Sequence, residues 1–207
     1  LTYVAIKSDV GQTLNLVNGS NKFTTTTVPG KIYEFDGNLK LTNQPFEPVT
    51  VPGKIQAESY IAMDGVQIED DESGEPNLGW INDGDFSEYL VKVPTAGAYT
   101  LTARVASAAE AKSTVTVVDS TGKALATLTV DPEKTKGWND WYETSTTIAL
   151  EKGEQKLRFN YSGESTYLLN FDWFSIAKGT DAVPATRRVA TTLDVRPVRM
   201  ARAPVAL

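Results

Sequence analysis

The sequence predicts an all-β protein whose main part is an antiparallel β-sandwich of the jelly-roll type, and three observations support this prediction. Between Ala98 and Ala106, apolar residues alternate with polar ones, which is the period-2 pattern of a half-buried antiparallel strand. Similar segments rich in Thr, Val and Leu follow at short intervals, separated by turn residues such as Asp131-Pro132. No stretch has a convincing helical period, and the one helix-like patch, residues 108–111, is too short.

The first 41 residues are expected to form a meander of short strands that belongs to another unit. Turn pairs such as Asn18-Gly19 and Asp36-Gly37 separate these strands. Because such a meander cannot bury both of its faces alone, we interpret residues 1–41 as the truncated remnant of a preceding β domain. The expected strands are Thr2 to Lys7, Thr13 to Val17, Lys22 to Val28, Ile32 to Phe35 and Leu39 to Leu41.

Residues 42–53 contain Pro45, Pro48 and Pro52, and this composition predicts a stiff linker. The sandwich itself is expected over residues 54–177. Its expected strands are Ala98 to Ala106, Ser113 to Val118, Ala124 to Val130, Thr144 to Leu150, Glu154 to Tyr161 and Tyr167 to Ile176.

The C-terminal segment, residues 178–207, differs from the rest in charge. It carries a net charge of +4, whereas the remainder of the chain carries −10. It has no clean periodicity, so we expect a poorly packed tail with one strand at Val189 to Val195. The tail is either a solvated terminal segment or a basic partner for the acidic module, an acidic polysaccharide or an anionic surface.

The composition of the chain excludes several classes of function. A net charge of −6 and a pI near 4.8 argue against general nucleic-acid binding. The chain contains no Cys and no His, which removes disulfides, His or Cys metal sites and any Ser-His-Asp triad. No apolar run reaches the length of about 18 residues needed for a membrane span. The first residue is Leu1, so the chain is interpreted as an excised piece of a longer protein.

Two tryptophans lie in loop-forming sequence. Trp80 precedes the turn residues Asn82 to Asp85, and Trp138 lies in Lys136 to Asp140. Indole rings on neighbouring loops can clamp a flat ligand with apolar faces, such as a pyranose ring. Glu69 and Asn170 could supply polar groups beside them. The alternative is that both tryptophans are ordinary core residues.

Oxygen-bearing side chains predict a cation site. Gln56 and Glu58 lie two positions apart and would share one face of a strand, and Asp172 in the last strand could lie beside them. Hard oxygen ligands of this kind suit Ca²⁺. The alternative reading is a set of surface carboxylates at a strand end. The acidic run Glu69 to Glu72 lacks the spacing of a calcium loop and is interpreted as solvated.

Five sequence blocks carry a family resemblance. They are Ile55 to Glu58, Gly79 to Tyr89, Ala96 to Leu101 with Arg104 to Ser107, Gly137 to Trp141, and Asn170 to Phe174. In this order, over about residues 54–177, they resemble the family 6 carbohydrate-binding modules. The resemblance implies a β-sandwich that binds polysaccharides, often xylan and sometimes β-glucan or agarose, at a loop site on one end.

The resemblance also implies roles for individual residues. Trp80 and Trp138 would sandwich a sugar, and Asn170 and Glu69 would hydrogen-bond it. Gln56, Glu58 and Asp172 would bind a structural Ca²⁺. The first aromatic of the clamp is often Tyr in the family and is Trp80 here, which enlarges the platform.

Some family members have a second binding cleft with a Trp after a Gly-Asp pair. That position is Phe86 here, so no second site is expected. The resemblance further implies a monomeric, secreted chain from the C-terminal part of a plant-cell-wall-degrading glycoside hydrolase. An upstream catalytic domain would be attached, and the module would target it to xylan.

Two other functions fit the composition. A small glycosidase would need paired carboxylates across a cleft, for which Glu69 and Asp71 are the candidates. A structural adhesion sandwich would leave the tryptophan clamp without a ligand.

Overall fold

The computed structural model describes residues 3–8, 10–28, 31–43 and 46–178. The basic tail, with the strand expected at Val189 to Val195, lies outside these residues. Regular structure in the described part is β-strand, apart from one 3₁₀ turn at Pro132–Lys134. The predicted fold class, an all-β antiparallel sandwich, is therefore confirmed.

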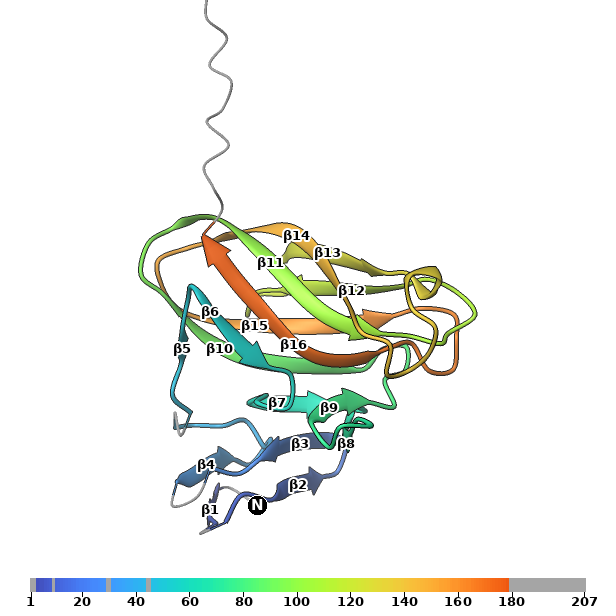
Figure 1. The fold of residues 1–207 in the computed structure, drawn as a ribbon. Helices are drawn as coiled ribbons and strands as arrows, with labels where there is room; N and C mark the ends of the chain where they lie inside the picture. The colour runs from blue at the N-terminus through green and yellow to red at the C-terminus, as the bar shows by residue number, and fades with distance from the viewer. Residues whose placement is uncertain (1–2, 9, 29–30, 44–45, 179–207) are drawn as a thin grey trace, which may run out of the picture.

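Two large sheets form the layers of the sandwich (Figure 1). The first sheet has the strand order β13-β12-β15-β10-β7-β3-β2, and β5 pairs in parallel with β10. Its strands are β2 (Thr13–Asn18), β3 (Asn21–Thr26), β5 (Val49–Thr50), β7 (Ala62–Asp64), β10 (Phe86–Val93), β12 (Ser113–Val118), β13 (Ala124–Val130) and β15 (Gly153–Ser162).

The second sheet has the order β14-β11-β16-β9-β8, and β6 also pairs with β16. Its strands are β6 (Gly53–Gln56), β8 (Gln67–Asp70), β9 (Pro76–Gly79), β11 (Gly97–Ala106), β14 (Tyr142–Leu150) and β16 (Asn170–Lys178). Strand β11 pairs with β14 and with β16 along nearly its whole length. The pairing with β16 shifts its register after Arg104.

The core lies between these sheets, and the alternation in β11 explains why. Tyr99, Leu101, Ala103 and Val105 are buried, whereas the polar residues between them are half exposed. Burial of apolar side chains contributes about 25 cal/mol per Å², so this one-sided pattern drives the two layers together. An aromatic cluster fills the centre, formed by Tyr89, Phe159, Phe171 and Phe174.

The N-terminal strands pack against the sandwich. Strands β2 and β3 form a hairpin, and β3 continues the first sheet where Thr24 lies opposite Met63 of β7. β1 (Tyr3–Lys7) and β4 (Ile32–Asp36) form a two-stranded sheet of their own. Their hydrophobic cluster includes Ile61 and Leu90 of the sandwich. Part of the expected linker is also packed, since β5 lies within residues 42–53 and Val51 is fully buried.

Two local predictions near the functional end differ from the structure. The last strand begins at Asn170 and not at Tyr167, because other loops hold Leu168: its N–H donates to Ile81 O at 2.9 Å, and its carbonyl accepts from Ser107 Oγ at 2.8 Å. Glu58 does not share a strand with Gln56 but follows the end of β6 in a turn.

Candidate functional site

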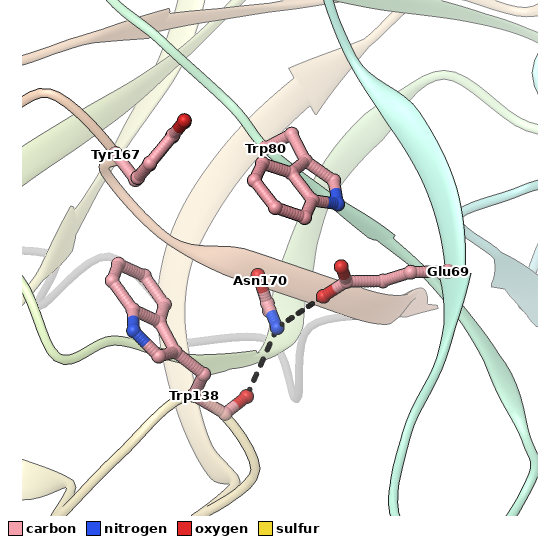
Figure 2. Close-up of a pocket in the computed structure, with 5 residues that line it drawn as sticks. All are labelled: Glu69, Trp80, Trp138, Tyr167 and Asn170. Atoms are coloured by element: carbon pink, nitrogen blue, oxygen red, sulfur yellow. Dashed lines mark hydrogen bonds between the residues drawn. The ribbon is translucent and has the colours of Figure 1, made fainter.

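A cavity of about 320 Å³ opens at one end of the sandwich. Its lining is drawn from strand ends and loops that are far apart in sequence. The lining residues are Glu69, Trp80, Trp138, Tyr167 and Asn170. The structure therefore brings together all four residues predicted for ligand binding and adds a fifth, Tyr167. Figure 2 shows the rings of Trp80 and Trp138 on opposite sides of this space.

Trp80 is held outward by its backbone. It follows Gly79, the last residue of β9, and its φ of 58° lies in the left-handed region that few non-glycine residues occupy. The Asn82 amide fixes this geometry by donating to Trp80 O at 2.8 Å, and the neighbouring Ile81 is buried. As a result Trp80 is 47% exposed and is not part of the core.

Trp138 lies on the loop that connects the 3₁₀ turn to β14. Thr135 Oγ1 donates to Gly137 O at 2.8 Å, and the Lys136 N–H donates to a carboxylate oxygen of Asp140, also at 2.8 Å. These two bonds close the loop on both sides of the tryptophan. Its ring is half-buried, so neither tryptophan is the fully buried core residue of the alternative reading.

Sequence reasoning missed Tyr167. Because the expected strand began at Tyr167, this residue was placed in a ladder and not in a loop. In the structure it is 41% exposed and meets Trp80 edge to face, with ring centroids 5.3 Å apart and an interplanar angle of 89°. The loop-forming run Ser162-Gly163-Glu164-Ser165 just before it is the signal that would have placed the strand start later.

A hydrogen-bonded pair, Glu69 and Asn170, forms the polar side of the pocket. The buried Asn170 amide donates to Glu69 Oε1 at 2.8 Å and to Trp138 O at 3.1 Å. Gly79 lies opposite Gln67 on the neighbouring strand, and a Cβ at Gly79 would lie 2.4 Å from the carboxyl carbon of Glu69. The missing side chain of Gly79 therefore leaves room for the Glu69 carboxylate.

This arrangement suits a flat ring with apolar faces and polar edges. The aromatic rings can cover the faces of such a ligand, since aromatic surfaces bind apolar C–H groups well. The carboxylate and amide can hydrogen-bond its substituents. A pocket of this size with few polar groups is typical of a small binding site.

The residues predicted to hold a cation also lie close together. Trp173 of β16 is in register with Gln56, and the Ala57 N–H donates to Asp172 O at 2.9 Å. Gln56 Oε1 and Glu58 Oε2 are both buried and without a hydrogen-bond partner among the described residues. Unpartnered buried oxygens are costly, and a cation would satisfy them.

The electrostatics of Glu58 also favour a cation at this place. Burial raises the pKa of Glu58, and the charges of Asp172 and Glu75 raise it further. Asp172 is already paired with Arg104. The part of the chain that the structure describes has no cluster of three His, Cys, Asp or Glu suited to a metal, and the predicted set has only two carboxylates plus one amide. All three predicted ligands are oxygen donors, the type that a hard cation such as Ca²⁺ takes, and Asp172 would be shared between the ion and Arg104.

The carboxylates proposed for the glycosidase alternative do not form a catalytic pair. Asp71 does not line the pocket, and its Oδ1 accepts hydrogen bonds from the Ser73 hydroxyl, Ser73 N and Glu75 N. The Ser73 hydroxyl, followed by these backbone donors, lowers the pKa of Asp71. A general acid needs a raised pKa, so the geometry gives this alternative no support.

Phe86 lies on the outer face of the first sheet and is covered. The Arg158 guanidinium lies 3.9 Å from the ring centroid of Phe86, and it also donates to Glu88 Oε1 at 2.7 Å. Lys156 Nζ lies 3.5 Å from the other oxygen of Glu88. A hollow of about 410 Å³ is lined by residues of this face together with residues of the N-terminal segment.

Comparison with known proteins gives a consistent result. Residues 56–178 match the sequence model of carbohydrate binding module family 6. A β-1,3-glucan-binding module of this family from Bacillus halodurans is 31% identical, with a TM-score of 0.57 over 63% of this chain and 99% of that one. A module from Clostridium cellulolyticum, solved with xylose, is 28% identical, with a TM-score of 0.55 over 62% of this chain and 99% of that one.

A longer relative is a 1,6-alpha-glucosyltransferase of Sporosarcina globispora, which is 24% identical over 73% of this chain. The chain spans only 12% of that protein. Within the described residues, no helix is long and apolar enough to cross a membrane.

Proposed function

Because this chain belongs to carbohydrate-binding module family 6 and is a non-catalytic carbohydrate-binding module, we propose that Trp80 and Trp138 hold one sugar ring of a polysaccharide between them. Tyr167 forms a third wall, and Glu69 and Asn170 hydrogen-bond the sugar hydroxyls. Aromatic contacts contribute about 0.5 to 1.5 kcal/mol each beyond area burial, so a site for one ring binds in the micromolar to millimolar range.

One observation carries this proposal. The cavity at the end of the sandwich is lined by the two exposed or half-buried tryptophans together with the Glu69–Asn170 pair. In a purely structural adhesion domain these rings would serve no purpose, and exposed aromatic surface would carry a solubility cost.

The ligand we propose first is xylan or a xylo-oligosaccharide. The relative solved with xylose supports this choice, whereas the relative described as binding β-1,3-glucan supports the main alternative. Both are polymers of neutral pyranose rings, which suits a pocket of this size.

We also propose that Gln56, Glu58 and Asp172 hold a structural Ca²⁺. The support is the pair of unpartnered buried oxygens on Gln56 and Glu58. When bound, the ion would neutralise the carboxylates and tie the end of β6 to β16, next to the strand that carries Asn170.

For the longer protein, we propose a secreted glycoside hydrolase in which this monomeric module targets an upstream catalytic domain to plant cell wall. The supporting observation is that the chain spans only 12% of the 1,6-alpha-glucosyltransferase, a carbohydrate-active enzyme, and 18% of a second relative, the clotting factor G alpha subunit of Tachypleus tridentatus. Weak binding is useful in that setting because tethering raises the local concentration of the enzyme at an insoluble substrate.

Affinity electrophoresis in gels containing xylan, β-1,3-glucan or agarose tests the proposal. Retardation by xylan, without release of reducing sugar in a parallel assay, is the expected result. Retardation by β-1,3-glucan alone would show that β-1,3-glucan, and not xylan, is the ligand. Sugar release that survives Trp138→Ala but is lost on removal of a carboxylate would restore the glycosidase alternative.

A further inference from the structure

The hydrogen-bond donors of Asn170 are fully used inside the protein. An amide has two N–H donors, and those of Asn170 go to Glu69 Oε1 at 2.8 Å and to Trp138 O at 3.1 Å. Both partners are pure acceptors, so they fix the orientation of the amide. Only Asn170 Oδ1, which is an acceptor, is left for a ligand.

Glu69 likewise offers only acceptor positions. One of its oxygens receives the Asn170 amide, while Oε2 has no hydrogen-bond partner among the described residues. Figure 2 shows the Asn170 amide between the two tryptophan rings and the Glu69 carboxylate next to it, close to Trp80. Both residues line the same cavity, so their free oxygens are available to one ligand. The donors of the other lining side chains are indole N–H and phenol O–H groups, which lie on the edges of rings.

The charge of Glu69 is not balanced by a neighbour. No Lys or Arg lines the pocket, and none of the ion pairs in the described part of the chain involves Glu69. A ligand that carries its own carboxylate would meet a like charge in a partly dry site.

From these observations we infer that the pocket selects neutral sugars that donate hydroxyl hydrogens to Glu69 and Asn170, and that it discriminates against uronic acids. This inference rests on the proposed function of the same pocket. It extends that function in two ways: the sugar hydroxyls donate the hydrogen bonds and the protein accepts them, and the ligand is neutral.

A matched pair of ligands tests the charge class. Methyl β-glucoside and methyl β-glucuronoside differ only at C6, which is a hydroxymethyl group in one and a carboxylate in the other. Titrations followed by the indole N–H signals in NMR should show binding at least about tenfold weaker for the glucuronoside, because of the like charge on Glu69. Equal affinities would overturn the inference.

The direction of the hydrogen bonds is tested by fluorinated glucosides. Fluorine can accept weakly but cannot donate, so at a hydroxyl that donates to Glu69 or Asn170, fluorine should weaken binding as much as removal of the hydroxyl does. The inference fails if every position tolerates fluorine but not hydrogen, because the protein would then be the donor.

Glu69→Gln provides the decisive variant. The glutamine keeps an oxygen for Asn170 and presents an N–H₂ group where Oε2 was, so the preference for the glucoside should fall to within about threefold. Glu154→Gln, the same change at the exposed far end of β15, should leave the preference intact. An unchanged preference in Glu69→Gln would contradict the role of Glu69.

The proposed function can fail separately from this inference. If neither methyl β-glucoside nor methyl β-xyloside shifts the indole signals, the pocket is not a sugar site. If the neutral sugars bind and the glucuronoside binds as well, only the selectivity is wrong.

Discussion

The end of β9 and the start of β10 each carry a partly exposed aromatic residue, and the surroundings of the two residues differ. Trp80, just after β9, has an open face and lies beside a cavity, and Tyr167 contacts it nearly at right angles. Phe86, at the start of β10, also faces a hollow, but the Arg158 guanidinium lies on its ring and is tied to Glu88. The difference shows that partial exposure alone does not leave the face of an aromatic ring accessible, because neighbouring side chains can cover it.

The largest expected effect comes from removing the open rings. Trp80→Ala and Trp138→Ala should each weaken polysaccharide binding by about 2 to 4 kcal/mol, as for a central aromatic contact. The free energy of unfolding should change by only about 1 kcal/mol or less, because these rings are not in the core. Affinity electrophoresis and thermal melts measure the two quantities.

Phe86→Ala is the matched control for these variants. Its ring is already covered, so binding should stay within about 0.5 kcal/mol of the unsubstituted protein. A loss of retention in Phe86→Ala as large as in Trp138→Ala would show that the sheet face binds the polysaccharide too.

Removal of calcium is expected to reduce stability more than binding. With Ca²⁺ at about 100 times its Kd, chelation should lower the free energy of unfolding by about 2 to 3 kcal/mol. Well below the melting temperature, retention by the pocket should persist. A melting temperature that is the same with Ca²⁺ and with excess chelator would remove the metal assignment.

The pH dependence of this effect has a defined sign. In the metal-free protein the folded pKa of Glu58 is raised above its ordinary 4.5, so its contribution to stability is full below that value and is lost as pH rises through the folded pKa. Ca²⁺ binds the ionised form, so its stabilising effect should grow over the same pH range. In chelator, Glu58→Gln should melt higher than the unsubstituted protein at pH 7, and this gain should vanish at low pH.

A smaller effect is expected from Gly79→Ala. Its Cβ would meet the carboxylate of Glu69, a flexible side chain that can move aside, so the bond to Asn170 should be lost without unfolding. Calorimetry should show sugar binding weakened by about 1 kcal/mol, the typical value of one hydrogen bond. Gly11→Ala, which makes only an ordinary contact at 3.6 Å, should have no effect on binding.

The smallest expected effect comes from a variant that tests whether Arg158 blocks ligand binding at Phe86. Introduced into Trp138→Ala, the change Phe86→Trp should restore less than about 0.5 kcal/mol of binding, because Arg158 would lie on the new ring as well. Recovery of retention in the double variant would show that the guanidinium does not block the face.

Much of the sandwich follows from local sequence. Strands β12 and β13 begin and end at the predicted residues. The inward residues of β11 are also those that the alternation indicated, because only one face of a strand with a period-2 pattern is apolar enough to be buried. In the region from Gly53 to Val93 a strand was expected around Gln56, but no strand bounds were predicted, since β6 to β9 are only three or four residues long and lack a visible period.

The site was predictable as far as it depends on residue type. Trp80 and Trp138 are marked by turn residues, and the structure places them at one cavity with Glu69 and Asn170. Tyr167 was missed because the local turn signal at residues 162–165 was not used, and because tertiary hydrogen bonds to Leu168, which no local pattern shows, fix where β16 begins. The covering of Phe86 by Arg158 also joins residues on different strands, so no local pattern could indicate it.

The left-handed backbone at Trp80 has an evolutionary consequence. Glycine would occupy this conformation with less strain, so replacement of the tryptophan can make the chain easier to fold while it abolishes recognition. Without selection for binding, substitutions at this position would thus tend to give variants that fold stably but do not bind the ligand. The persistence of an indole here would have to come from continued selection by the ligand, since folding does not demand it.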